Sequence, residues 1–137
     1  LSQRARRTCK MSEPVWLERD DALGIHELML AQYGGLAGVR DEGMLESALA
    51  RPKNLHAYGT ESIPALAAVY ASGVVKNHPF LDGNKRTRFM LAATFLELNG
   101  FELTASEESV VIQTLGLAAS EVTEEQYAAW LTAESLP

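Results

Sequence analysis

The stretch from His78 to Arg86 reads His-Pro-Phe-Leu-Asp-Gly-Asn-Lys-Arg and brings together the residue types that phosphate chemistry requires. His78 can act as a general base toward a hydroxyl group, because an imidazole titrates near neutral pH. Asp82 supplies a hard oxygen ligand, and one carboxylate together with substrate phosphates is a common way of holding Mg2+. Phe80 is expected to anchor the loop in the core. The stretch is therefore predicted to be an active-site loop.

The helix that follows this loop begins with an unusual set of charges. Apolar residues at helical spacing predict a helix from Asn84 to the capping Gly100. Lys85, Arg86 and Arg88 lie near its positive end, where each cation is disfavoured by about 0.3 to 1 kcal/mol. A bound anion would offset this cost. Free backbone N–H groups, the helix dipole and the added cations together predict a phosphate site.

Two further residues fit a phosphate site, although all of these residues also have ordinary structural roles. Gly83 lets the backbone approach an anion closely, and Asn84 either caps the helix or points its amide at a phosphate. Taken singly, His78 could merely complement a helix dipole, and Asp82 with Gly83 could form an ordinary turn. We favour the chemical role because the residues fall within one short loop whose cations have no structural explanation.

The loop resembles the signature of the Fic/Doc superfamily, His-x-Phe-x-Asp/Glu-Gly-Asn-x-Arg, at every position. It is most similar to the Doc (death-on-curing) toxin branch of type II toxin-antitoxin systems, in which Lys precedes the Arg. The similarity extends to residues 32–36 and 40–49 and covers most of the chain from about Val15 onward. The resemblance implies a protein kinase-like enzyme with ATP as substrate and Mg2+ as its metal. It implies His78 as catalytic base, Asp82 as metal ligand, and a phosphate-binding set made of Gly83, Asn84, Lys85 and Arg86.

Two positions separate this chain from the Fic-type adenylyltransferases. Those enzymes have Gly where this chain has Lys85, and a second Arg where it has Phe89. Arg88 is one position out of register and is not expected to substitute, because successive helix positions turn a side chain by about 100°. The resemblance to Doc toxins then implies transfer of the γ-phosphate of ATP to a Ser or Thr hydroxyl of a target protein. A translation factor such as elongation factor Tu is the expected target, and its modification would inhibit translation.

Two alternatives to phosphate transfer are kept. The second hypothesis is transfer of AMP, as in the Fic-type adenylyltransferases. The third is a catalytically silent module that binds an antitoxin and acts as a co-repressor, although the presence of His78, Asp82 and Arg86 argues against it.

The sequence also bears on regulation. Many Fic proteins carry an inhibitory helix with the pattern Ser/Thr-x-x-x-Glu-Gly/Asn. Residues 104–108 and 120–124 match its first five positions, but Ser109 and Glu125 follow in place of Gly or Asn. We therefore expect no internal inhibitor. The resemblance implies instead a separate Phd-like antitoxin with a DNA-binding domain and a disordered tail that folds into a groove on the toxin.

Composition limits the other possibilities. A length of 137 residues, 47% of them hydrophobic, predicts a single domain over residues 11–137. The net charge of −6 argues against direct binding of nucleic acid over a broad surface. The single Cys9 excludes an internal disulfide, and no apolar run reaches membrane-spanning length, which favours a cytoplasmic protein. Residues 1–10 are interpreted as a flexible extension or a cloning remnant before Met11.

The active-site loop is expected to lie in an all-α fold, a compact bundle of about six helices with a short flap loop. A first helix starts near residue 20 and ends at Gly34, with His26 exposed on its surface. A second covers about residues 41–50, with Met44 on its buried side and Pro52 after its end.

Residues 51–59 are predicted to form a polar, irregular loop. By resemblance, this loop takes the place of the flap that positions the target segment beside the site. An ordinary surface connection is the alternative. The flap residues suited to contact a target are Lys53, Asn54, His56 and Tyr58.

The remaining helices follow from simple patterns. The run from Ser62 to Asn77 is nearly all small or apolar, which predicts a buried helix that delivers His78 to the site. Capping-box spacings at Thr104 and Thr123 predict two more helices near the C-terminus. Their expected core residues are Val110, Val111, Leu115, Tyr127, Trp130 and Leu131.

Overall fold

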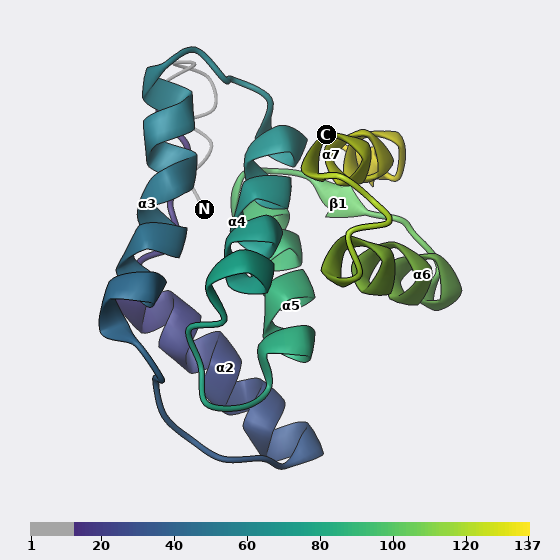
Figure 1. Ribbon diagram of the computed structural model, residues 1–137. Coiled ribbons are helices and arrows are strands. Elements are labelled where there is room, and N and C mark those ends of the chain that lie inside the picture. The colour runs from purple at the N-terminus through teal and green to yellow at the C-terminus, as the bar shows by residue number, and fades with distance from the viewer. Residues whose placement is uncertain (1–12) are drawn as a thin grey trace.

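The computed structural model describes residues 13–137, and over that range the chain forms six α-helices and two very short strands (Figure 1). The helices are α2 (Arg19–Tyr33), α3 (Glu42–Ala57), α4 (Ile63–Asn77), α5 (Asn84–Leu98), α6 (Glu107–Ala118) and α7 (Glu124–Ala133). Strands β1 (Glu102–Leu103) and β2 (Ser135–Leu136) pair antiparallel. The predicted all-α bundle is confirmed. The predictions for residues 1–10 and Met11 lie outside the described residues.

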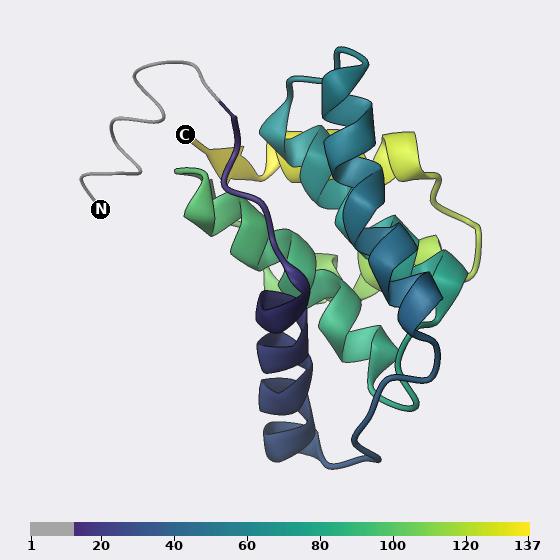
Figure 2. The ribbon, with the colours of Figure 1, turned by 90° about the vertical axis from the view of Figure 1, so that its left-hand side faces the viewer.

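Helix α4 is the centre of the bundle and packs against α3, α5 and α7 (Figures 1 and 2). Ser62 caps it by accepting the N–H of Ala65, and ten of its fifteen residues are buried. Small residues let α3 approach closely, because a Cβ at Gly73 would lie only 3.1 Å from the Cβ of Ala48. The prediction of a buried helix that leads into His78 is therefore confirmed.

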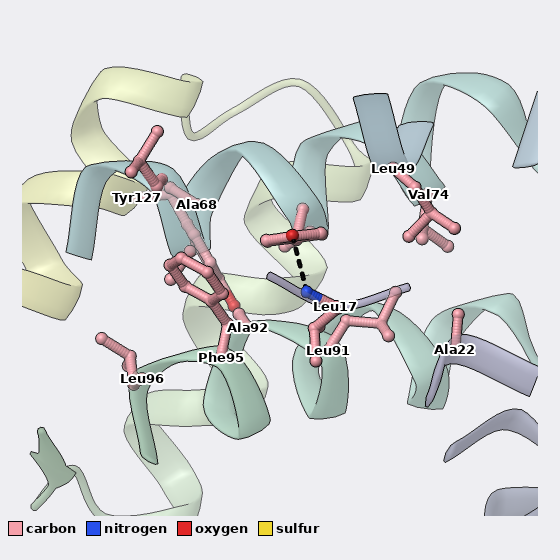
Figure 3. Packing of buried hydrophobic residues seen from close by; sticks show 14 of the residues in the cluster. Leu17, Ala22, Leu49, Ala68, Val74, Leu91, Ala92, Phe95, Leu96 and Tyr127 are labelled. Carbon is pink, nitrogen blue, oxygen red and sulfur yellow. Dashed lines mark hydrogen bonds between the residues drawn. The ribbon is translucent and has the colours of Figure 1, made fainter. Parts of the chain in front are cut away.

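The core is built mainly by α4 and α5 with the segment that precedes α2, and α2, α3, α6 and α7 add further buried residues (Figure 3). Tyr70 and Phe95 pack with their ring centroids 4.9 Å apart. The N–H of Leu17 donates a hydrogen bond of 3.1 Å to the hydroxyl of Tyr70. Burial raises the pKa of Tyr70, so this hydroxyl stays neutral. The bond fixes the extended segment that precedes α2. The position of this segment sets the direction in which α2 runs toward the active-site loop.

Helix α3 is longer than predicted, because it continues through Pro52 to Ala57. A proline inside a helix removes one backbone hydrogen bond and costs roughly 3 kcal/mol. Here Pro52 itself is buried, and Leu49 and Leu55 on either side of it also pack against the core. Burial of this apolar face offsets the missing bond. The predicted end of the helix before Pro52, and the irregular loop after it, are therefore wrong.

Three residues expected in the core are exposed instead. Met44, Val111 and Leu115 point outward, the last two with 54% and 52% of their surface accessible. Helix α6 lies at the edge of the bundle and buries only Thr114, Gly116 and Leu117. Tyr127 and Leu131 of α7 are fully buried as expected, whereas Val110 and Trp130 are half-buried.

Two capping predictions had different outcomes. The capping box of Thr123 with Gln126 is present at the start of α7. Helix α6 is capped by Ser106, whose hydroxyl accepts the N–H of Ser109, and not by Thr104. The hydroxyl of Thr104 donates instead to the carbonyl of Glu134 near the β1–β2 pair. Within residues 13–137, no helix is both long and apolar enough to cross a membrane.

Candidate active site

An open cavity of about 300 Å³ lies beside the loop that joins α4 to α5 and the first turn of α5. Every residue from His78 to Arg86 lines it except Pro79 and Phe80, which are buried beneath it. Phe80 has no exposed surface, as expected of an anchor. The structure therefore brings together the predicted base, metal ligand and phosphate-binding residues. The lining residues are His78, Leu81, Asp82, Gly83, Asn84, Lys85 and Arg86.

His78 ends α4 in a left-handed conformation (φ 49°, ψ 55°), which is uncommon for a residue with a side chain. Its N–H donates to the carbonyl of Val74, and its own carbonyl accepts a 2.8 Å bond from Nε of Arg40. A second guanidinium nitrogen of Arg40 donates to the carbonyl of Asn77 at 2.9 Å. Arg40 therefore holds the backbone turn that exposes the imidazole to the cavity.

The segment beside the site is the loop 34–41 between α2 and α3. Val39 pairs with Phe80 as an isolated antiparallel bridge, and the N–H of Leu81 donates to the carbonyl of Gly38. The N–H of Arg40 donates to the carbonyl of Pro79 at 2.7 Å. A short loop thus lies where a flap was expected, but it precedes α3 and does not follow it.

The structure does not bring the four predicted flap residues to the cavity. The amide of Asn77 bonds the carbonyl of Met44, so the site lies at the first turns of α3. Since a helix rises 1.5 Å per residue, Tyr58 is about 21 Å further along the axis than Met44. Lys53 pairs with Glu18, the backbone carbonyl of Asn54 accepts the N–H of the helix-capping Tyr58, and the ring of His56 packs on Trp16.

The carboxylate of Asp82 is held by two backbone donors. Its Oδ2 accepts the N–H of Leu36 at 3.1 Å, and its Oδ1 accepts the N–H of Gly83 at 2.8 Å. These two bonds are the main cause that lowers the pKa of Asp82 from its ordinary value of 3.8, and Arg86 and His26 add smaller effects. The side chain is exposed to the cavity and is ionised at neutral pH.

The start of α5 has the properties expected of an anion site. Gly83 is its N-cap with φ 77°, no side chain caps the first N–H groups, and the first turn contains no acidic residue. Lys85 and Arg86 are exposed beside these N–H groups. The guanidinium of Arg86 lies 4.6 Å from the ring centroid of Tyr33, a distance at which a cation is attracted to an aromatic face.

Asn84 has a role that differs from both of its expected ones. Its side chain is buried, and its Oδ1 accepts the N–H of Phe80 while its Nδ2 donates to the carbonyl of Phe80. Oδ1 and one hydrogen of Nδ2 therefore close the loop, and the side chain does not cap the helix. The backbone N–H and the second hydrogen of Nδ2 are the groups that Asn84 could offer to a phosphate.

His26 was predicted to be exposed, but only 2% of its surface is accessible. Its Nε2 lies 2.7 Å from the carbonyl oxygen of Asp82, and its ring stacks on Phe80 at 4.0 Å. The helical spacing of His26 from Ala22 and Met29, which are both buried, was a signal that places it on the inner face.

Residues 16–96 match the family model described as the Fic/DOC family. The chain belongs to the Fic/DOC family. It is 40% identical over 93 residues to "Toxin Doc" of Mycolicibacterium smegmatis, which covers 66% of this chain and 68% of that protein. It is 33% identical over 106 residues to "Protein kinase doc" of Escherichia phage P1, which covers 75% of this chain and 82% of that protein. The resemblance in the motif is thereby confirmed, and the matched range contains every residue of the cavity.

The residues present fit the Mg2+ that the Fic/DOC resemblance implies. Among residues 13–137, no group of three or more His, Cys, Asp or Glu side chains could hold a metal by itself. Asp82 is ionised, and each of its oxygens accepts only one hydrogen bond, which leaves electron pairs for a metal. Mg2+ is commonly bound by one carboxylate, substrate phosphates and water. The donor set therefore suits Mg2+ that arrives with a nucleotide.

Titration of Asp82 gives a first prediction for this Fic/DOC site. The pKa of Asp82 in the folded protein lies below its value in the unfolded chain. The two backbone bonds therefore stabilise the folded protein fully above the unfolded pKa, and this contribution is lost as pH falls through the folded pKa. We expect the carboxyl carbon of Asp82, followed by NMR, to titrate with a midpoint below 3.8. A midpoint at or above that value would contradict the arrangement of the loop.

Gly35→Ala gives a second prediction. Gly35 has φ 125°, and a Cβ there would lie 2.7 Å from Oδ2 of Asp82. The alanine should strain the backbone by about 1 to 2 kcal/mol and displace the carboxylate. We expect lower thermal stability and weaker binding of Mg2+ with ATP. Gly59→Ala is the matched control, because Gly59 also has a positive φ but meets no neighbour; equal affinities in the two variants would argue against the contact with Asp82.

Arg88 does not join the phosphate site, although it was grouped with the cations of the first turn. Only 4% of its surface is exposed, its Nε makes no hydrogen bond, and burial lowers the pKa of its guanidinium. The titratable group that affects its pKa is Tyr127 of α7, which does not line the cavity. Arg88 therefore does not take the place of the second Arg of the adenylyltransferases, as expected from the turn of about 100° between successive helix positions.

We therefore predict that Arg88→Met stabilises the protein. An apolar side chain of similar length removes a buried, incompletely bonded cation, and replacing such groups raises the free energy of unfolding by about 1 kcal/mol or more. Urea unfolding should show the gain, while calorimetry should show unchanged affinity for ATP with Mg2+. A clear loss of affinity would instead place Arg88 in the phosphate site.

Proposed function

We propose that this protein is a Doc-like toxin that transfers the γ-phosphate of ATP to a Ser or Thr hydroxyl of a target protein. The observation that carries the proposal is the cavity in which His78, the ionised Asp82 and the uncapped, cation-rich start of α5 meet. The two relatives support it, because one is named a toxin and the other a protein kinase.

The residues of the cavity supply each part of such a reaction. The imidazole of His78 accepts the proton of the attacking hydroxyl, whose oxygen forms a bond to the γ-phosphorus. The bond from this phosphorus to the bridging oxygen breaks, and ADP leaves with the electron pair. Lys85, Arg86 and the first N–H groups of α5 stabilise the negative charge on the phosphoryl oxygens. Asp82 would hold Mg2+, which neutralises phosphate charge when bound.

Phosphate transfer is favoured over AMP transfer by the placement of the motif's cations. Lys85 lines the cavity and adds bulk and charge where the adenylyltransferases that the motif resembles have Gly. Their second Arg has no counterpart in the cavity, since Phe89 is half-buried and Arg88 is buried. The bulk of Lys85 reduces the room for a triphosphate in the AMP-transferring orientation, and the missing second Arg removes a positive charge that would bind it in that orientation.

The target and the partner are further parts of the proposal. A translation factor such as elongation factor Tu would be modified in the cytoplasm, with arrest of translation as the result. Leu36 and Leu81 are exposed next to Asp82 and offer apolar contacts to a protein target. A Phd-like antitoxin would restrain the toxin in trans.

The test is to incubate purified protein with a bacterial lysate and ATP labelled at either the α- or the γ-phosphate. We expect label from the γ-position alone, on a Ser or Thr residue. Label from the α-position would establish AMP transfer and refute our interpretation of Lys85. Absence of label from both positions, together with tight binding of an antitoxin, would favour the silent co-repressor.

A further inference from the structure

One face of α2 runs along the active-site loop. His26, Leu30 and Tyr33 are spaced four and three residues apart and therefore share a side of the helix. His26 contacts Asp82, a Cβ on Gly83 would lie 3.4 Å from Leu30, and Tyr33 lies under Arg86. Helix α2 also packs against α5, which begins at this loop (Figures 1 and 2). This face is the support on which the phosphate-binding backbone rests.

The bond between His26 and Asp82 has a defined direction. A backbone carbonyl can only accept a hydrogen bond, so Nε2 of His26 must carry the hydrogen across the 2.7 Å contact. The bond is made by a side chain with 2% of its surface exposed, and water cannot readily replace it. It joins two residues 56 positions apart in the sequence.

The same peptide unit is held at its other end. The carbonyl of Asp82 and the N–H of Gly83 belong to one planar peptide. His26 binds the carbonyl at 2.7 Å, while Oδ1 of the Asp82 carboxylate accepts the N–H at 2.8 Å. Since the carbonyl and the N–H point in opposite directions, fixing the carbonyl also directs the N–H toward the carboxylate. Rotation of this peptide would remove one of the two donors that orient Asp82.

The ring of His26 has a separate packing role. It stacks on the fully buried Phe80 with centroids 4.0 Å apart and an interplanar angle of 11°. A Cβ at Gly83 would lie 3.5 Å from Nε2 of His26, so the loop lies directly against the ring edge. The hydrogen bond and the stacking can therefore be removed independently by substitution.

We propose that His26 is a positioning residue of the active site, which orients the Asp82–Gly83 peptide and through it the metal-binding carboxylate and the first N–H groups of α5. This inference rests on the proposed function in that it takes the cavity to bind ATP with Mg2+. It concerns His26 Nε2 as a hydrogen-bond donor and gives it no contact with the reacting atoms.

Two variants separate the bond from the stacking. His26→Phe keeps an aromatic ring against Phe80 and loses the donor. His26→Gln keeps a donor, because its amide nitrogen is as many bonds from Cβ as Nε2 is, and loses the ring. His56→Phe is the control, since His56 also packs on an aromatic ring, that of Trp16, but lies at the far end of α3.

The two variants should lose different properties. One mainly loses affinity for ATP with Mg2+, measured by calorimetry, and the other mainly loses thermal stability. We expect His26→Phe to bind about 10-fold more weakly, as is common for groups that support a metal ligand, with a smaller loss of thermal stability than in His26→Gln. His26→Gln should bind within about threefold of the wild type but melt earlier, because the stacking with Phe80 is lost. A merely structural residue would lose both properties together, and that result, or wild-type affinity in His26→Phe, would overturn the proposal.

The role of His26 can be decided separately from the proposed function. If the wild type binds ATP with Mg2+ but transfers no phosphate, the proposed function fails while the affinities still decide the role of His26. If the wild type does not bind ATP with Mg2+ at all, both are refuted. Should a variant fail to fold, long-range proton–nitrogen NMR of the wild-type ring decides instead: a hydrogen on Nε2 is expected, and a ring with its only hydrogen on Nδ1 would overturn the proposal.

Discussion

His78→Ala is expected to lower the rate of phosphate transfer by about 10²- to 10⁴-fold, the range typical for loss of a general base. The imidazole lines the cavity on the exposed end of α4, while its backbone is fixed by Arg40 and Val74. In the proposed reaction, removing the imidazole removes the group that accepts the proton, while the loop stays in place. The measurement is the initial rate with γ-labelled ATP at saturating nucleotide. Affinity for ATP should stay within about threefold, because no phosphate contact is assigned to this side chain.

The left-handed conformation of His78 offers a matched control for stability. Any residue with a Cβ is strained at φ 49°, whereas glycine is not. His78→Gly should therefore be more stable than His78→Ala by about 1 kcal/mol and equally inactive. Recovery of activity in the more stable glycine variant would show that the alanine variant was inactive through misfolding, and it would remove His78 from the role of base.

The parts of the site that are contiguous in the sequence could be predicted from it. The residues from His78 to Arg86 form one loop, so their chemistry and spacing are visible without any knowledge of the fold. Helix α4 could also be predicted, because a run that is apolar on nearly every side must be buried. The charge pattern at the start of α5 was informative for Lys85 and Arg86, which line the cavity.

The supporting residues could not be predicted, because they come from distant segments. His26, Leu36 and Arg40 bond to the loop from 56, 46 and 38 positions away. Each of these bonds depends on how α2 and the loop 34–41 pack, and no local pattern records that packing. A polar side chain is normally exposed unless it finds a hydrogen-bond partner inside the protein, and His26 is buried because the carbonyl of Asp82 faces it.

The irregular loop predicted for residues 51–59 was wrong for a related reason. Pro52 is a strong local signal for the end of a helix, but tertiary packing overrides it when the proline and its neighbours are buried. The loop that borders the site is residues 34–41, and its glycines at positions 34, 35 and 38 all have a positive φ. Gly35 and Gly38 also lie against Asp82 and Leu81, so this loop, and not residues 51–59, borders the site.

The second large effect is expected from Arg86→Ala, which should lower the rate of transfer by about 10²- to 10³-fold. Arg86 is exposed in the first turn of α5 beside the uncapped N–H groups, where the phosphoryl oxygens would gain charge in the proposed reaction. Its guanidinium is held over Tyr33 at 4.6 Å, so the cation is placed before any substrate binds. The loss should be measured as kcat/KM for ATP with γ-label. Arg19→Ala is the control, because Arg19 is also exposed but pairs with Glu42 away from the cavity lining.

Two further variants test separately the charge of Arg86, the planar shape of its guanidinium and the placement of this group over Tyr33. Arg86→Lys keeps the charge but lacks the planar fork that binds two phosphate oxygens, so an intermediate loss is expected. Tyr33→Leu keeps the guanidinium and removes only the ring beneath it, an attraction of about 0.5 to 1 kcal/mol, which corresponds to a few-fold loss. If Arg86→Ala retained nearly full activity, the transition-state charge would have to be carried by Lys85 and the backbone N–H groups alone. A loss in Tyr33→Leu as large as in Arg86→Ala would show that Tyr33 contacts the substrate directly.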